Sequence, residues 1–274
     1  MNMKEITLDE LKSIEIDILK YIHDFCKQNG IQYFLMSGTL LGAVRHKGFI
    51  PWDDDIDISM KREEYEKFVK IFNNTNSRYK VITCYNNENY YLPFAKVVDN
   101  NTLLIENLDK KTNMGVFVDV FPLDTYRAQD IETGTFYKRQ LGLIKALTMK
   151  TSKLYKYPKT KQPIVFFMKV LTAFLSPNWF ARRIDRIAQD KSDKNGELLG
   201  CAVTLVYGKK ELMDKDIFND AVEMEFEGHY FCAPQGYKNL LENLYGDYMK
   251  LPPLEKRVTH HDFKAYHLVD NMRK

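Results

Sequence analysis

Two carboxylates spaced for cation binding stand in residues 53–58, which read Asp-Asp-Asp-Ile-Asp-Ile. In an extended strand Asp55 and Asp57 share one face, and the two isoleucines occupy the other. Carboxylates about 7 Å apart on one strand face repel each other unless a cation lies between them, and such oxygen ligands suit Mg²⁺ or Mn²⁺. The pattern predicts a metal site at Asp55 and Asp57. The alternative, a solvent-facing acidic turn, fits poorly with the isoleucines and with the apolar Pro51 and Trp52 upstream.

A third carboxylate lies in residues 115–122, which read Gly-Val-Phe-Val-Asp-Val-Phe-Pro. Asp119 is in the middle of this apolar run, which we expect to be a strand that ends at Pro122. An unpaired carboxylate there is costly, so Asp119 should face a partner or a cation. We expect it to complete the metal site, and the alternative is an Asp119 held by backbone amides. Asp124, after the proline, is expected in a turn.

A turn upstream of the carboxylates has the composition of a phosphate-binding element. Ser37, Gly38 and Thr39 follow a short apolar run, 31–36, that is expected to be a buried strand, and they precede a short helix predicted over 40–44. Glycine permits close backbone approach, and the hydroxyl groups together with a helix N-terminus can hold phosphate oxygens.

Three basic residues, Arg45, His46 and Lys47, lie in a loop predicted over 45–54, before the paired carboxylates. Arg45 is the best candidate for a bidentate phosphate contact, and Lys47 is a second basic candidate for substrate binding. His46 has two interpretations. It either deprotonates an acceptor hydroxyl or is a loop histidine bonded to the backbone.

The order of these motifs resembles the nucleotidyltransferase fold of the DNA polymerase β type, with a longer gap between the glycine and the paired carboxylates. In this longer form, residues 37–58 and 115–124 resemble the LicD family of phosphotransferases. Residues 226–253 resemble the C-terminal signature of that family. Fukutin-type ribitol-phosphate transferases share the core motif. The resemblance runs from about Tyr33 to Pro253, and 130–214 carries little of it.

The resemblance implies transfer of a phospho-alcohol, typically phosphocholine from CDP-choline, with release of CMP. The acceptor would be a hydroxyl of a cell-surface glycan (teichoic acid, lipopolysaccharide or capsule) or of its undecaprenyl-linked precursor. Mg²⁺ at Asp55, Asp57 and, by inference from the residues alone, Asp119 would neutralise the diphosphate. CDP-ribitol and CDP-glycerol remain alternatives, as does a true nucleotidyltransferase that moves NMP from NTP. A non-catalytic binding module would have lost a metal carboxylate, and none is lost here.

The alcohol is the least determined part of the substrate. Choline carries a quaternary ammonium, which proteins hold by cation–π contacts and nearby negative charge. Aromatic residues before and after the carboxylates could form such a cage: Trp52, Tyr85, Tyr90 and Tyr91. The segment 85–91 also holds Glu88 and three asparagines, and the asparagines would suit a polyol, so composition leaves both alcohols open.

The helices and strands expected around these residues indicate an α+β fold. We expect a nucleotidyltransferase-like mixed sheet with flanking helices and an inserted helical segment. Thr7 and Glu10 have capping-box spacing and predict a helix that ends at Gly30. Further elements follow from apolar periodicity. We expect helices at 62–72, across 130–190 and at 236–245, strands at 80–85, 94–98, 102–106 and 115–121, and a hairpin over 222–233. The expected division is a catalytic core over 1–130, a basic helical insertion over 131–195, and a C-terminal β-hairpin and helix unit over 196–274 that completes the catalytic domain.

Charge is distributed unevenly along the chain. Lys+Arg minus Asp+Glu is 40 − 37 = +3, which does not suggest a nucleic-acid partner. Residues 133–184 nevertheless hold eleven Lys or Arg and no acid, so the remainder carries 3 − 11 = −8. This basic segment is either a solvated helical face or a surface for anionic lipid. An apolar run, 164–175, and the helix after it, which starts at Ser176 and Pro177, predict a peripheral membrane contact within 133–190. The polar N-terminus predicts no signal peptide, so we expect a cytoplasmic protein, on the inner face of the membrane if it binds there.

Overall fold

The computed structural model describes residues 4–106, 114–259 and 263–268. The first long element is α1 (Leu8–Asn29). Its predicted capping box is present, because the Glu10 amide donates to Thr7 Oγ1 at 3.2 Å and the Glu10 carboxylate accepts from the Thr7 amide at 3.0 Å. Gly30 ends the helix in the left-handed conformation, with φ 58°. Both predicted ends of this helix are confirmed.

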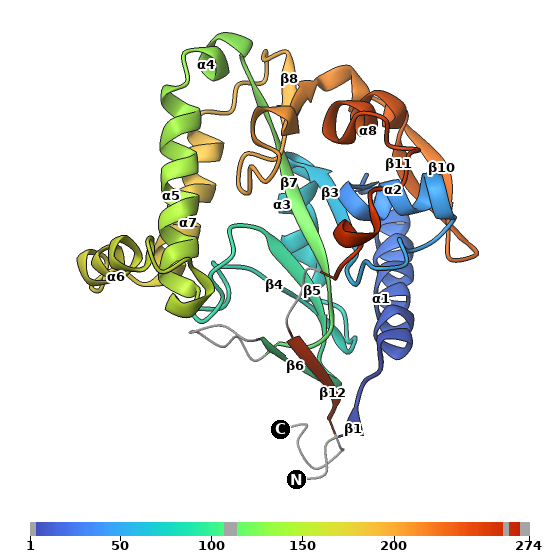
Figure 1. Ribbon diagram of the computed structural model, residues 1–274. Coiled ribbons are helices and arrows are strands. Elements are labelled where there is room, and N and C mark those ends of the chain that lie inside the picture. Colours follow the sequence, from blue (N-terminus) through green and yellow to red (C-terminus); the bar gives the residue numbers. More distant parts are fainter. Residues whose placement is uncertain (1–3, 107–113, 260–262, 269–274) are drawn as a thin grey trace.

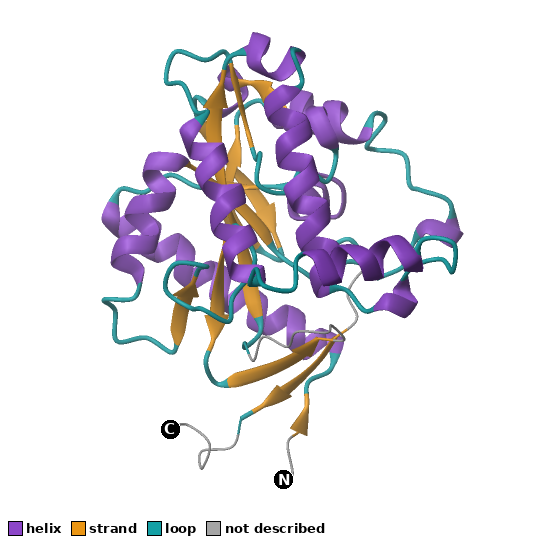
Figure 2. Cartoon of the chain, turned by 90° about the vertical axis from the view of Figure 1, so that its left-hand side faces the viewer, coloured by secondary structure: helices purple, strands orange, loops and turns teal. Residues whose placement is uncertain are grey.

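The centre of the molecule is a mixed sheet with the order β2-β3-β7-β5-β4. β3 and β7 are parallel, whereas β2 pairs with β3, and β5 with β4 and β7, in the antiparallel sense. Figure 2 shows these strands running through the middle of the molecule with helices around them. The α+β class predicted from sequence is therefore confirmed. The strands are β2 (Phe34–Leu35), β3 (Asp57–Lys61), β4 (Tyr79–Ile82), β5 (Ala95–Asp99) and β7 (Phe117–Tyr126).

The end predicted for β7 at Pro122 is wrong, because the strand continues to Tyr126. The Asp119 amide donates toward the β3 side, to the Ile56 carbonyl, so alternation turns the Pro122 nitrogen to the opposite edge. On that edge β5 pairs only with residues 117–120 of β7, and β8 (Leu198–Gly200) only with 124–126. Pro122 falls in the gap between the two ladders, where its missing N–H interrupts no pairing.

Helices cover the sheet and frame its ends (Figure 1). α2 (Ser37–His46) connects β2 to the loop before β3, and α3 (Arg62–Phe72) follows β3 as predicted. A small sheet of β1 (Lys4–Glu5), β12 (Phe263–His267) and β6 (Thr102–Glu106) lies at the lower end of Figure 1.

The helical segment forms the left side of Figure 1, and its prediction over 130–190 is confirmed. α5 packs against both α6 and α7. The sequence predicted an apolar surface on both the 164–175 run and the helix after it. α7, the second of these, turns Phe180, Ala181 and Ile184 into the core, where each is at most 3% exposed. The exposed apolar surface therefore lies mainly on α6. The helices are α4 (Ala128–Glu132), α5 (Thr135–Thr151), α6 (Gln162–Leu171) and α7 (Pro177–Asp190). Within the described ranges, no helix combines the length and apolar character needed to span a bilayer.

The C-terminal part adds β9 (Leu212–Asp214), the predicted hairpin of β10 (Ala221–Phe226) and β11 (His229–Pro234), and α8 (Tyr237–Tyr245). Glu227 and Gly228 form the hairpin turn with φ of 51° and 74°, as a two-residue turn of this twist requires. β11 contacts β2 and α8 contacts α2, so this part of the chain closes over the end of the sheet where α2 begins.

Candidate active site

Two of the predicted carboxylates are brought together by strand register. Asp57 on β3 is paired with Asp119 on β7 in the parallel ladder. Register-paired residues of neighbouring strands point to the same face of a sheet, and both side chains line one cavity of about 520 Å³. Asp55, which precedes β3, lines the same cavity. The three carboxylates named from sequence therefore meet in one place.

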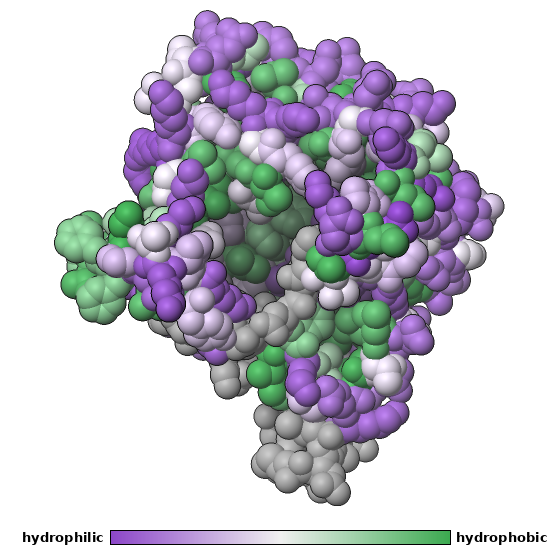
Figure 3. Space-filling model, viewed as in Figure 1, coloured by the Kyte–Doolittle hydropathy of each residue, from purple (hydrophilic) through white to green (hydrophobic). Residues whose placement is uncertain are grey.

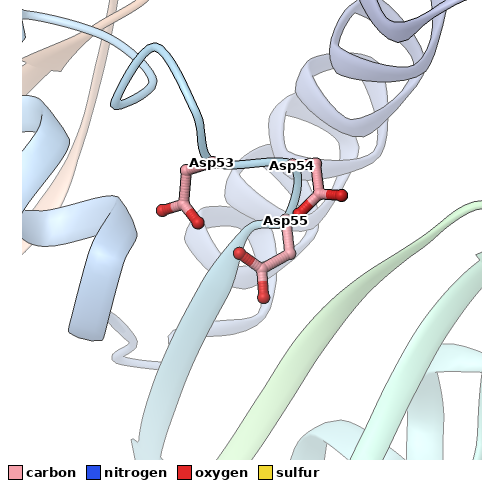
Figure 4. Close-up of side chains that lie close together, drawn as sticks. All are labelled: Asp53, Asp54 and Asp55. Atoms are coloured by element: carbon pink, nitrogen blue, oxygen red, sulfur yellow. The ribbon is translucent and has the colours of Figure 1, made fainter. Parts of the chain in front are cut away.

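Two further aspartates accompany Asp55 in the loop before β3 (Figure 4). One carboxylate oxygen from each of Asp53, Asp54 and Asp55 lies within 4.8 Å of the others. Asp53 also lines the cavity, whereas Asp54 is buried at 6% exposure. A Cβ atom at Gly38 would lie 2.4 Å from Asp53 Oδ2, so glycine is required there for this carboxylate to approach the N-terminus of α2.

Electrostatic repulsion is concentrated at Asp57. Burial raises the pKa of this carboxyl well above its usual range, and the charges of Asp55, Asp119 and Asp53 raise it further. Lys96 is the cation that opposes these effects. Repulsion among buried carboxylates is a situation that a divalent cation relieves.

Lys96 is a site residue that the sequence did not reveal. It lies on β5 in register with Asp119, and its Nζ donates to Asp119 Oδ1 at 2.5 Å. The ammonium also lies 3.2 Å from the centroid of the Phe117 ring, and the residue is only 4% exposed. Asp119 thus has a protein cation as its partner, in addition to facing the cavity.

Glu15 is a second residue that the sequence analysis missed. It lies on the buried face of α1 at 2% exposure, and its Oε2 atom has no hydrogen-bond partner among the described residues. Burial raises the pKa of its carboxyl well above the usual range, and the charges of Asp55 and Asp54 add to this effect. An acid at an apolar position of a predicted helix was the available signal.

The Ser-Gly-Thr segment is helical rather than a turn before a helix, because α2 begins at Ser37. Ser37 and Gly38 line the cavity, and Ser37 has an unusual φ of 48°. Thr39 is placed differently. Its Oγ1 accepts from the Asp57 amide at 2.8 Å, so it anchors the start of β3 next to the carboxylates.

The three basic residues lie at the end of α2, so the loop predicted from residue 45 begins later. Arg45 Nε donates to His46 Nε2 at 3.0 Å, and its Nη1 donates to the Tyr248 carbonyl at 2.8 Å. Lys47 caps the helix with φ 62°. Burial lowers the pKa of His46, and the charge of Arg45 lowers it further. None of the three lines the described cavity.

The aromatic residues divide into those at the cavity and those elsewhere. Trp52 lines it, whereas Tyr85 donates from its hydroxyl to Asp185 Oδ2 at 2.8 Å, outside it. Tyr90 is buried in a small separate cluster, and Tyr91 lines an adjacent cavity of about 230 Å³. The other rings around the 520 Å³ cavity come from distant parts of the chain: Phe94, Phe121, Tyr207 and Tyr245.

Tyr207 and Tyr245 form the wall contributed by the C-terminal part. Their ring centroids are 5.3 Å apart at 82°, and their hydroxyl oxygens are 3.3 Å apart. Glu211 lines the cavity beside them and accepts from the Tyr207 amide and from Thr204 Oγ1. Burial raises the pKa of the Glu211 carboxyl to about 7.

The charged side chains that line the cavity, within the described part of the chain, are all acidic: Asp53, Asp55, Asp57, Asp119 and Glu211. Carboxylate oxygens without nitrogen or sulfur ligands suit a hard divalent cation. These carboxylates would repel a diphosphate, and a divalent cation bound between them would remove that repulsion. Rings next to a carboxylate suit a quaternary ammonium group.

Comparison with known proteins identifies the family of the chain. A family model described as "LicD/FKTN/FKRP, nucleotidyltransferase domain" matches residues 30–163. The lipopolysaccharide cholinephosphotransferase LicD of Haemophilus influenzae is 34% identical over 271 residues, which cover 96% of this chain and 99% of that protein. The ribitol 5-phosphate transferases FKRP of mouse and human are 40% identical over 45 residues, which cover 16% of this chain and 9% of each of those proteins.

Proposed function

Because the chain belongs to the LicD family of phosphotransferases, we propose that it transfers phosphocholine from CDP-choline to a hydroxyl group of a cell-surface glycan or of its lipid-linked precursor, with release of CMP. The observation that carries the proposal is one cavity in which aspartates from β3, β7 and the loop before β3 face aromatic walls. The reaction would take place on the cytoplasmic side of the membrane.

Asp55, Asp57 and Asp119 would hold Mg²⁺. Asp53, in the same loop as Asp55, lies near enough to assist. Two features support this assignment: the ligands are all oxygens, and burial together with the charges of the neighbouring carboxylates raises the pKa of Asp57. When bound, the metal would neutralise the diphosphate and make the acceptor hydroxyl easier to deprotonate.

The protein's own groups would orient the donor. Ser37 and Gly38 lie at the N-terminus of α2, whose partial positive charge favours a phosphate oxygen, and both face the cavity. Lys96 holds Asp119 in place from the neighbouring strand. The apolar part of the wall, which includes Leu41 and Ile50, would exclude water from the reacting phosphate.

Choline is favoured over ribitol by the residues that line the cavity. Trp52, Tyr207 and Tyr245 offer ring faces, and Glu211 offers a carboxylate beside two of them. A polyol would use the hydroxyl groups of Ser37, Ser59 and Thr204, which also line the cavity, but it would not use the ring faces. The asparagines that suited a polyol in sequence do not line the cavity, and Asn86 instead accepts from the Thr83 amide in a local turn.

The test of the reaction is incubation with Mg²⁺ and, separately, CDP-choline, CDP-ribitol, CDP-glycerol and the four NTPs, followed by phosphorus NMR. We expect CMP release from CDP-choline in the presence of a glycan acceptor. Preferential use of CDP-ribitol would overturn the choline assignment, and pyrophosphate release from an NTP would indicate nucleotidyl transfer instead.

The choline site is tested by substitution of the aromatic residues that line the cavity. Tyr207→Leu and Tyr245→Leu should each raise KM for CDP-choline, by about 2-fold to 30-fold for a cation–π contact of ~0.5–2 kcal/mol. Tyr207→Phe keeps the ring and should have a smaller effect. Tyr85→Leu is the matched control, because this tyrosine lies outside the cavity. Equal KM values in all of these variants would place the alcohol elsewhere.

A further inference from the structure

Helix α6 exposes nearly all of its apolar residues. Within the helix only Val165 is buried, at 1% exposure. Figure 1 shows α6 at the left edge of the molecule, and Figure 3 shows the apolar patch there on the same face as the central hollow. The exposed set, with its exposed fractions, is Ile164 (62%), Phe166 (60%), Phe167 (64%), Val170 (57%), Leu171 (54%) and Phe174 (82%).

A contiguous apolar patch of this kind is costly in water and marks an interaction surface. The helix is nevertheless held firmly on the protein. Lys150 Nζ donates to the Thr172 carbonyl at 2.6 Å, and Lys169 Nζ donates to the Ser152 carbonyl at 2.7 Å. These contacts tie the C-terminal ends of α5 and α6 together. The apolar side is therefore presented by a fixed element.

The charge around α6 identifies the kind of partner. No acidic residue occurs in 133–184, and Lys159 and Lys161 are exposed just before the helix. If two copies of the chain met through α6, two basic segments without an acidic residue would come together and repel each other. An anionic bilayer offers the complement of both features, because it attracts the lysines and accepts the apolar side chains.

A second cavity connects this side of the molecule to the catalytic one. It is lined by Ile144 and Leu147 of α5, and it shares Phe94, Thr204 and Val206 with the catalytic cavity. α5 also packs against α6. The two cavities thus share part of their walls, and the second is lined by α5, the helix that carries α6.

We propose that α6, with the following turn to Phe174, is a peripheral membrane anchor that lies in the headgroup region of an anionic bilayer and brings the catalytic cavity to lipid-linked acceptors. Membrane binding itself does not depend on which phospho-alcohol is transferred.

The test is co-sedimentation of the full chain with vesicles made of equal parts phosphatidylglycerol and phosphatidylcholine, and with vesicles of phosphatidylcholine alone. We expect binding to the anionic vesicles that weakens as salt is raised. Phe167→Glu combined with Phe174→Glu should weaken binding by about tenfold or more, because two inserted rings become charged. Leu254→Glu is the matched control, since Leu254 is 76% exposed in a different part of the chain, and it should bind as the wild type does.

Circular dichroism melting checks that the double variant is folded, and Phe167→Ser combined with Phe174→Ser replaces it if it is not. Absence of wild-type binding at low salt, or equal binding by the folded variant, overturns the proposal. A wild-type dimer that the variant dissociates, in the absence of vesicle binding, would mean that a second copy covers α6. Transfer to a soluble acceptor should be unchanged in the variant, so failure of the anchor is distinguishable from failure of the proposed reaction.

Discussion

Two buried acidic clusters lie in this protein, and their partners differ. Asp124 on β7 and Asp185 on α7 share the guanidinium of Arg62, which contacts Asp124 at 2.8 and 2.6 Å and Asp185 at 3.0 Å. Although burial alone would lower it, the pKa of Arg62 is held above its usual value by these two carboxylates. At Asp57 the charges of Asp55, Asp119 and Asp53 raise the pKa of a buried carboxyl, and Lys96 opposes them.

This difference separates a structural role from a functional one. In the Arg62 cluster each carboxylate has a geometrically matched donor, and the three residues join α3, β7 and α7. In the Asp57 cluster burial and the charges of neighbouring carboxylates raise the pKa of Asp57, as is expected where a cation binds. The comparison predicts opposite consequences for substitutions in the two places.

The largest expected effect is on activity. Asp57→Asn should reduce CMP release by about a thousandfold at saturating Mg²⁺, the usual loss when a group that stabilises transition-state charge is removed. Without metal, the melting temperature should not fall, because one of several repelling charges is gone. Asp220→Asn, an exposed acid, is the control and should leave both quantities unchanged. Near-normal turnover in Asp57→Asn would contradict the metal assignment.

The second prediction concerns a loss of stability at the Arg62 cluster. Arg62→Met leaves Asp124 and Asp185 buried without their cation and should lower the free energy of unfolding by about 3–5 kcal/mol in urea titrations. Arg127→Met removes an ion pair with Asp193 whose side chains are 46% and 29% exposed, and it should cost less than about 1 kcal/mol. Similar losses in both variants would mean that the Arg62 cluster is not a structural centre.

Lys96 lies in the Asp57 cluster, but like Arg62 it is a buried cation in an ion pair. Lys96→Met should lower the free energy of unfolding by about 1–3 kcal/mol without metal. Mg²⁺ should recover part of this loss in Lys96→Met but none of the loss in Arg62→Met. If Mg²⁺ stabilised neither variant nor the wild type, the cavity would not be a cation site.

The smallest expected effect concerns pH. Since the pKa of Glu211 is about 7, its carboxyl is largely neutral at pH 6 and largely ionised at pH 8. Only the ionised form attracts a quaternary ammonium, so KM for CDP-choline should fall a few-fold as pH rises across this range. Glu211→Gln should flatten that dependence while Asp216→Asn should not. An unchanged pH profile in Glu211→Gln would remove Glu211 from alcohol binding.

The sequence by itself determined the parts of the protein that depend on near neighbours. The capping box of Thr7 and Glu10, the end of α1 at Gly30 and the hairpin turn at Glu227 and Gly228 all use contacts a few residues long. The order of the motifs also identified the family and the class of enzyme, both of which are confirmed. The metal-binding role of Asp55, Asp57 and Asp119 remains a prediction, although the structure places all three in one cavity.

Only the tertiary structure decided which distant residues complete the site. Strand register places Lys96 beside Asp119, and the gap between two ladders lets β7 continue past Pro122 to carry Asp124 into the Arg62 cluster. Chain closure by the C-terminal part brings Tyr207 and Tyr245 to the cavity, while Tyr85 is directed to α7. Such placements depend on pairing energies between segments far apart in the chain, and a one-residue change of register would turn every side chain to the other face. No local pattern of residue types records that choice.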